Sequence, residues 1–111
     1  MIRVVSMRGS LKPAAEGVLR LRIDRATALG NPFRIEQGVA TRKDVVDTYR
    51  KWVMSDRSAA ACEARTQIRQ IIKLDAEGHR IELACWCSPL PCHGDVIKEL
   101  VVKARKELAS C

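Results

Sequence analysis

The alternation of apolar and polar residues predicts three short strands. Residues 2–7 form a strand-like apolar run, and residues 18–23 alternate apolar with basic side chains, as a half-buried strand does. Residues 81–86 are apolar and bounded by turns, and so short a run fits a central strand better than a helix. We therefore expect one sheet built from these three segments.

Apolar residues three and four positions apart predict three helices. Thr41 is followed three residues later by Asp44, a pair that caps a helix N-terminus. A second helix is expected over residues 58–74. Its expected buried residues are Ala61, Ala64, Ile68, Ile71 and Ile72, and its expected solvent-facing residues are Arg65, Arg69 and Lys73. The apolar residues of the first helix are Val45, Val46, Tyr49, Trp52 and Val53, and those of the last are Val96, Ile97, Leu100, Val101, Ala104 and Leu108.

The order of these elements predicts an α/β fold. The two helices between the second and third strands form a crossover, which places those strands parallel. A chain of 111 residues is the size of one domain. We expect a single domain over residues 1–111, with a small three-stranded mixed sheet packed against about three helices.

Composition and charge indicate which kinds of partner the protein is expected to bind. No apolar run approaches the roughly 18 residues of a membrane span, and no signal peptide is evident, so a cytoplasmic protein without a membrane partner is expected. The formal charge of +7 favours an anionic partner. Nucleic acid is one candidate, but the 20 Lys and Arg residues are dispersed and the four aromatic residues suggest no stacking platform.

Three of the five cysteines cluster in one loop. Cys85, Cys87 and Cys92 lie within eight residues, beside His93, whereas Cys62 lies in a helical stretch where it is expected to pack. Without a secretion signal, reduced thiols, metal ligands or reactive groups are favoured over a disulfide framework. The loop joins the end of a strand to a helix, the edge at which open α/β sheets bind ligands.

Besides packing in the core, the residues of this loop fit two chemical roles, zinc binding and nucleophilic catalysis. Thiolates and imidazole are good zinc ligands, and Cys85, Cys87, Cys92 and His93 form a candidate Cys3His set, although their spacing is unusual for zinc. Alternatively, Cys92 is a nucleophile whose pKa the helix N-terminus lowers, with His93 or the second histidine, His79, as its base and Asp95 beside them or simply capping the helix. Buried cysteine is also common in cores, and this reading is strongest for Cys85.

Two motifs resemble a known family. They are Leu29-Gly30-Asn31-Pro32-Phe33 and Cys85-Trp86-Cys87 with Cys92-His93-Gly94-Asp95, and between them lies the helix that begins at Thr41-Arg42 and contains Tyr49. In this order they resemble the bacterial and phage family named domain of unknown function 4326. The family has a glycine and an arginine shortly before the first motif; Arg25 matches here, but Asp24 replaces the glycine.

The resemblance implies a small domain, often phage-encoded, whose two motifs meet in space. Arg25, Asn31 and Arg42 are then expected to bind a ligand together with Cys87, the arginines holding phosphate and Asn31 a base or ribose. The catalytic candidates are Cys92, His93 and Asp95. Our leading hypothesis is a protein that binds a nucleotide-like or phosphorylated small molecule, with thiol-dependent catalysis as an open option. The alternatives are a zinc-stabilised, non-catalytic module that contacts nucleic acid or a host protein, and an inhibitor of a host enzyme.

Overall fold

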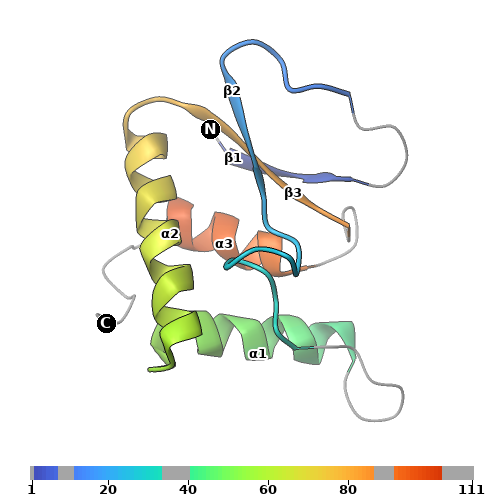
Figure 1. The fold of residues 1–111 in the computed structure, drawn as a ribbon, viewed down its shortest axis with the longest axis vertical. Coiled ribbons are helices and arrows are strands. Elements are labelled where there is room, and N and C mark those ends of the chain that lie inside the picture. Colours follow the sequence, from blue (N-terminus) through green and yellow to red (C-terminus); the bar gives the residue numbers. More distant parts are fainter. Residues whose placement is uncertain (1, 8–11, 34–40, 87–91, 104–111) are drawn as a thin grey trace.

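The computed structural model describes residues 2–7, 12–33, 41–86 and 92–103. Three strands, β1 (Ile2–Ser6), β2 (Val18–Arg22) and β3 (Arg80–Cys85), form one sheet in the order β1-β3-β2 (Figure 1). Both pairings are parallel. The α/β prediction is confirmed, whereas the expectation of a mixed sheet is wrong.

The all-parallel sheet follows from where β3 lies. Because β3 lies between β1 and β2, the first two strands are not neighbours and form no hairpin. The connection over residues 7–17 is long enough, at up to about 3.3 Å per residue, to lead the chain back to the start of a parallel five-residue strand.

Strand register separates the two faces of the sheet. Ile81 and Leu83 of β3 belong to the hydrophobic core, and their partners across the register are apolar. These partners are Ile2, Val4, Leu19 and Leu21. On the opposite face, Glu82 is aligned with Arg3 on one side and Arg20 on the other.

Glu82 forms ion pairs with both of these arginines. Arg20 Nε donates to the carboxylate over 3.0 Å and Arg3 Nε over 2.8 Å, although Glu82 itself is only 4% exposed. Burial pushes the pKa of Glu82 upward, but the hydrogen bonds from Arg3 and Arg20 outweigh it and the pKa is lowered. The carboxylate therefore links all three strands through side chains.

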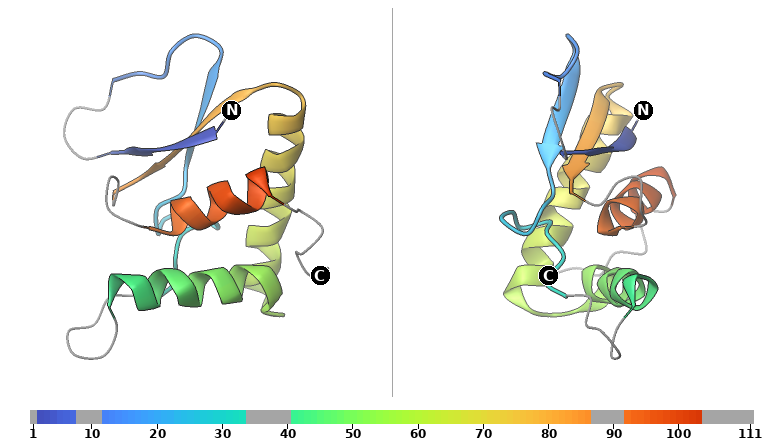
Figure 2. Two further views of the ribbon diagram at one scale, coloured as in Figure 1. Left: turned by 180° about the vertical axis from the view of Figure 1, so that it is seen from behind. Right: turned by 90° about the vertical axis from the view of Figure 1, so that its right-hand side faces the viewer.

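Three helices pack against one another beside the sheet, and the last of them lies against one sheet face (Figure 2). They are α1 (Arg42–Ser55), α2 (Ala59–Ala76) and α3 (His93–Val102). Helix α3 packs against β1 and β3, and α1 packs against α2 and α3. This leaves the start of α1 and the start of α3 near the carboxyl ends of β2 and β3. The expected core positions Ala104 and Leu108 lie outside the described residues.

The predicted caps and faces of the first two helices are largely confirmed. Thr41 caps α1, and Asp44 completes a capping box with it. Arg65 is the exception, because it is fully buried rather than solvent-facing. Its guanidinium donates to the carbonyl of Val53 over 3.2 Å, in the last turn of α1 where helix carbonyls lack partners within the helix. The buried arginine therefore joins the end of α1 to α2.

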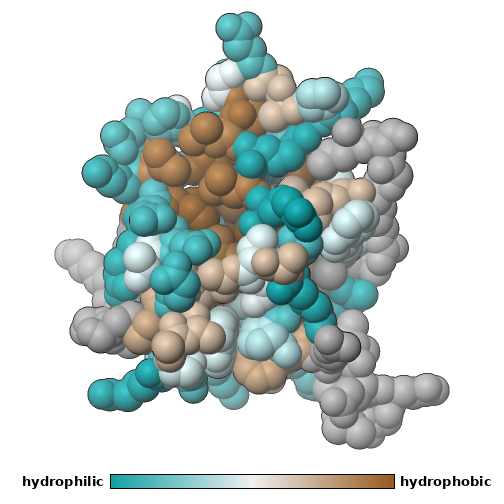
Figure 3. Space-filling model, viewed as in Figure 1, coloured by the Kyte–Doolittle hydropathy of each residue, from teal (hydrophilic) through white to brown (hydrophobic). Residues whose placement is uncertain are grey.

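Hydrophobic residues gather on one outer face, beside β2 and toward α2 (Figure 3). Half-buried Leu21 and Ile72 come from these two elements and pack against the core. Within the described ranges, no helix is both long enough and apolar enough to cross a membrane.

Candidate functional site

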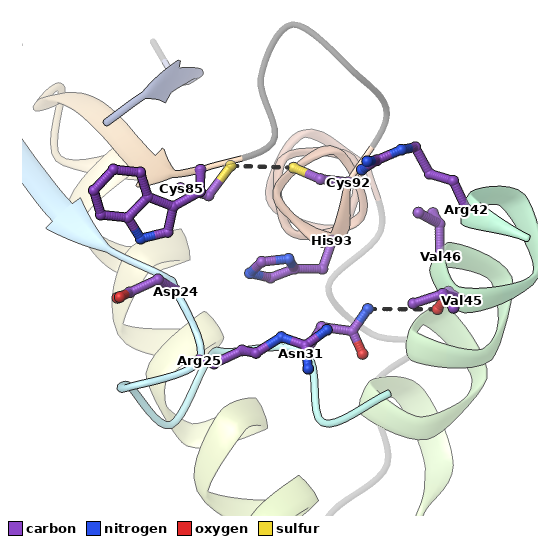
Figure 4. Close-up of a pocket in the computed structure, with 10 residues that line it drawn as sticks. Asp24, Arg25, Asn31, Arg42, Val45, Val46, Cys85, Cys92 and His93 are labelled. Carbon is purple, nitrogen blue, oxygen red and sulfur yellow. Dashed lines mark hydrogen bonds between the residues drawn. The ribbon is translucent and has the colours of Figure 1, made fainter. Parts of the chain in front are cut away.

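A cavity of about 220 Å³ lies where β2 and β3 end, between the loop after β2 and the first turns of α1 and α3 (Figure 4). Open parallel sheets bind ligands at this edge. The residues that line the cavity are Asp24, Arg25, Asn31, Arg42, Val45, Val46, Cys85, Trp86, Cys92 and His93.

Most of the residues selected from the sequence share this cavity. Asn31 comes from the first motif and Arg25 from the stretch just before it, Cys92 and His93 come from the second motif, and Arg42 comes from the start of α1. The two motifs therefore meet in space. Asp95 is not among the residues that line the cavity, and Cys87 lies outside the described residues.

Asn31 holds its own loop in place. Its Oδ1 accepts the Phe33 amide over 2.9 Å, and its Nδ2 donates to the Val45 carbonyl in α1 over 3.5 Å. Tyr49 supports the same loop, because its buried hydroxyl donates to the Leu29 carbonyl over 2.8 Å. The loop is thus fixed against α1. The role of Asn31 toward a base or ribose stays a prediction.

His93 is a buried, neutral imidazole at the cavity wall. Its Nε2 donates to the backbone carbonyl of Ile23, and its ring packs edge-on against Tyr49 with centroids 5.2 Å apart. Burial lowers the pKa of His93 below its usual value, although the hydrogen bond to Ile23 acts in the opposite direction. A neutral imidazole that donates from Nε2 keeps its lone pair on Nδ1. The side chain is therefore fixed in one tautomer.

Cys92 and Asp95 form the N-terminal cap of α3. The Asp95 carboxylate accepts the Cys92 amide over 2.9 Å, and the Cys92 sulfur accepts the Gly94 amide over 3.3 Å. This is the arrangement of a capping box, with cysteine in the place usually taken by serine or threonine. The structure gives Asp95 the capping role that the sequence left as an alternative; a catalytic role stays untested.

The sulfur atoms of Cys85 and Cys92 lie 3.3 Å apart. A disulfide bond is about 2.05 Å long, so both residues are thiols. Within the described residues, no group of three histidine, cysteine, aspartate or glutamate side chains is placed to hold a metal ion. The fourth member of the candidate zinc set, Cys87, lies outside these residues. The zinc hypothesis therefore stays a prediction.

Two arginines and one carboxylate are among the described residues that line the cavity. Figure 4 shows Arg25 and Arg42 on opposite sides of it, and Arg25 donates to the carbonyl of Phe33 over 2.8 Å. The carboxylate of Asp24 accepts from Arg22 over 2.6 Å, and this hydrogen bond holds the pKa of Asp24 below its ordinary value despite burial. Asp24 is thus paired with Arg22, and the cationic side chains among the described residues that line the cavity are Arg25 and Arg42.

Sequence reasoning did not select Asp24 and Trp86 as site residues, and it assigned Val45 and Val46, which also line the cavity, only to the apolar face of a helix. Trp86 follows β3 directly and is 50% exposed, although the sequence suggested that it would continue the strand. Asp24 follows β2 by two residues and is about nine-tenths buried. The signal that could have found both is their position just after parallel strands, where ligand sites form.

A comparison with protein-family models matches residues 11–103 to the model described as Domain of unknown function (DUF4326). The match covers most of the chain and both motifs. Searches of curated proteins and of solved structures found no match.

Proposed function

Since the chain belongs to the family described as Domain of unknown function (DUF4326), whose description states no activity, we propose a function from the cavity itself: it binds a nucleotide-like, phosphorylated ligand. The observation that carries this proposal is the convergence of two arginines and a half-exposed tryptophan on one small cavity.

Phosphate is the ligand group that best fits the arginines. A guanidinium presents several N–H donors in a planar fork that matches phosphate oxygens. Arg25 and Arg42 approach the cavity from different elements, so an anion between them meets donors on two sides (Figure 4). Asp24, the one carboxylate among the described residues that line the cavity, has its charge offset by Arg22, 2.6 Å away. An anionic ligand therefore meets little repulsion.

The size of the cavity restricts the ligand. Pockets for drug-sized molecules usually measure about 300–1,000 Å³, and this one measures about 220 Å³. A phosphate with its sugar fits such a space, whereas a dinucleotide does not. A base attached to that sugar would lie toward the rim, where the exposed indole of Trp86 offers a flat surface for stacking. A mononucleotide is therefore the ligand class we favour.

Asp24 provides a second polar contact for such a ligand. Its Oδ2 is paired with Arg22, and its buried Oδ1 has no hydrogen bond of ordinary length from the described residues, although the nearby Trp86 side chain also lowers the pKa of Asp24. A buried acceptor without a donor is destabilising by about 1–3 kcal/mol. A ribose hydroxyl is a suitable donor, and carboxylates bind ribose in this way in other nucleotide sites. This contact favours a nucleotide over inorganic phosphate.

Isothermal titration calorimetry tests the proposal with defined probes. The probes are the four common nucleoside 5′-monophosphates, ribose 5-phosphate, inorganic phosphate and adenosine. We expect at least one nucleotide to bind more tightly than either inorganic phosphate or adenosine, because only the nucleotide engages both the arginines and Trp86. Equal binding of adenosine and adenosine 5′-monophosphate, or no binding of any phosphorylated probe, would contradict the proposal.

Variants of cavity residues, with an exposed arginine as the control, test whether the nucleotide binds in the cavity. Arg42→Gln removes a charge that faces the cavity and should weaken nucleotide binding by about tenfold to a hundredfold, the range for a hydrogen bond to a charged group. Arg57→Gln removes an equal charge from an exposed position between α1 and α2 and should leave the affinity unchanged. Trp86→Ala should weaken nucleotide binding by about fivefold or more but leave the binding of inorganic phosphate unaffected.

A further inference from the structure

Two thiols meet at the wall of the cavity. Cys85 is the last residue of β3, Cys92 is the cap of α3, and their sulfur atoms lie 3.3 Å apart. Both side chains are almost fully buried, at 1% and 3% exposure. Figure 4 shows the two sulfur atoms facing each other across the gap between strand and helix. A shift of little more than 1 Å would bring them to the bonding distance of a disulfide.

The two sulfur atoms have different surroundings. Cys92 Sγ accepts the Gly94 amide, and it lies at the N-terminus of α3, where the helix dipole is positive. Both features favour the thiolate, the reactive form of cysteine. Both cysteines belong to the hydrophobic core, but Cys85 is the last residue of β3 and has no helix N-terminus of its own to favour the thiolate. Cys92 is therefore the better nucleophile, and Cys85 is placed to react with it afterwards.

The cavity gives small molecules access to these buried thiols. Both cysteines line it, so a reagent that enters the cavity reaches the sulfur atoms without unfolding the domain. A volume of about 220 Å³ admits hydrogen peroxide easily. A large peptide disulfide such as oxidised glutathione does not fit. The route thus selects for small oxidants.

We propose that Cys85 and Cys92 form a redox-active dithiol that a small peroxide oxidises to a disulfide. The Cys92 thiolate attacks one peroxide oxygen: an S–O bond forms, the O–O bond breaks, and the departing hydroxide takes a proton to become water. The Cys85 sulfur then attacks the Cys92 sulfur: the S–S bond forms, the S–O bond breaks, and the released hydroxide takes the Cys85 proton. The dithiol loses two electrons, and the peroxide gains them as it becomes two waters. This activity is independent of the proposed nucleotide binding, and its assay contains no nucleotide.

Peptide mapping after oxidation tests the pairing directly. Reduced full-length protein is treated with one equivalent of hydrogen peroxide, the remaining thiols are alkylated with iodoacetamide, and the protein is cleaved after Trp86 to separate Cys85 from Cys92. We expect a Cys85–Cys92 cross-link that dithiothreitol reverses. The same cross-link is expected in a Cys87→Ser background, which removes the cysteine between them in the sequence.

Single variants test the order of the two steps. In Cys85→Ser, Cys92 should stop at the sulfenic acid, which dimedone traps. In Cys92→Ser, Cys85 should oxidise at least about tenfold more slowly, because the activated thiolate is lost. Serine is a good helix cap, so this variant keeps the cap of α3. Cys62→Ser, at a half-buried position in α2, is the matched control and should oxidise at the wild-type rate.

The cross-link mapping needs no variant, so a variant that fails to fold leaves the test intact. A wild-type protein in which both thiols stay fully alkylatable would overturn the proposal. So would a cross-link that requires Cys87, or a wild-type protein that accumulates sulfenic or sulfinic acid without a disulfide. Oxidation by oxidised glutathione as fast as by peroxide would overturn the route through the cavity.

Discussion

Glycine is required at position 30 because the loop passes very close to a neighbouring segment of backbone. A Cβ atom there would lie 2.6 Å from the Cα of Arg25 and would also clash with the carbonyl of Asp24. At Gly94, by contrast, an added Cβ would meet side-chain atoms, with Ile23 Cδ1 at 2.9 Å and Val4 Cγ1 at 3.0 Å. Each of the two motifs thus contains a glycine where the cavity walls pack together.

Alanine should therefore be tolerated differently at these two positions. Gly30→Ala should lower the free energy of unfolding by about 3 kcal/mol or more, because backbone atoms cannot move aside cheaply. Gly94→Ala should lower the free energy of unfolding by only about 1 kcal/mol, because side chains can shift and alanine favours the helix. Urea unfolding followed by tryptophan fluorescence measures both. Equal losses would show that the loop does not pack against residues 24 and 25 as described.

At the scale of elements, α1 and α3 begin in the same way. Each has a capping box, formed by Thr41 with Asp44 in α1 and by Cys92 with Asp95 in α3. In the first turn of α3, the amides of Gly94 and Asp95 are therefore engaged within the helix cap. Its contribution to the cavity comes through the side chains of Cys92 and His93 rather than through an open anion site at the helix end.

This similarity gives a matched test of Asp95. Asp95→Ala and Asp44→Ala each remove one capping carboxylate and should each lower the free energy of unfolding by about 1 kcal/mol. Nucleotide affinity should change little and equally in both variants. If Asp95→Ala abolished nucleotide binding while remaining folded, Asp95 would be a functional residue rather than a cap.

The ion pairs of Glu82 predict how the sheet responds to acid. The pKa of Glu82 is lowered in the folded state by Arg3 and Arg20, so its stabilisation is complete above the unfolded-state value of about 4.3 and is lost as the pH falls through the folded-state pKa. Glu82→Gln should lower the free energy of unfolding by about 1–3 kcal/mol near about pH 7. The difference in free energy of unfolding between Glu82→Gln and wild type should shrink at about pH 3. If urea unfolding gave the same difference at both pH values, it would contradict this prediction.

At the scale of the whole molecule, the sequence predicted the elements better than their arrangement. Periodicity located the strands and helices, because each buries one apolar face. The direction of β1 could not be predicted, because the residue pattern does not reveal that β3 inserts beside it. Arg65 was misplaced because a charged residue on a helix is usually exposed, and only the packed structure shows the Val53 carbonyl that it reaches.

For the candidate site as well, the sequence predicted the segments better than the contacts between them. The two motifs indicated which segments carry the candidate chemistry, and the strand-to-helix position indicated the edge of the sheet. Trp86 was missed because strand ends are poorly defined by sequence, and one residue decides whether a side chain continues the strand or lies at the rim of a cavity. The contact between Cys85 and Cys92 depends on the packing of α3 against β3, which no local pattern describes.

Nucleotide binding in the cavity, the central claim, is tested most directly by NMR on ¹⁵N-labelled protein titrated with adenosine 5′-monophosphate. The chain has two tryptophans, so each indole N–H gives a distinct signal. Trp86 lines the cavity and Trp52 does not. We predict that the Trp86 indole shifts progressively, together with the amides of Arg25 and His93, while Trp52 changes little. A titration in which the Trp86 signal stays still, or in which only Trp52 moves, would contradict the account.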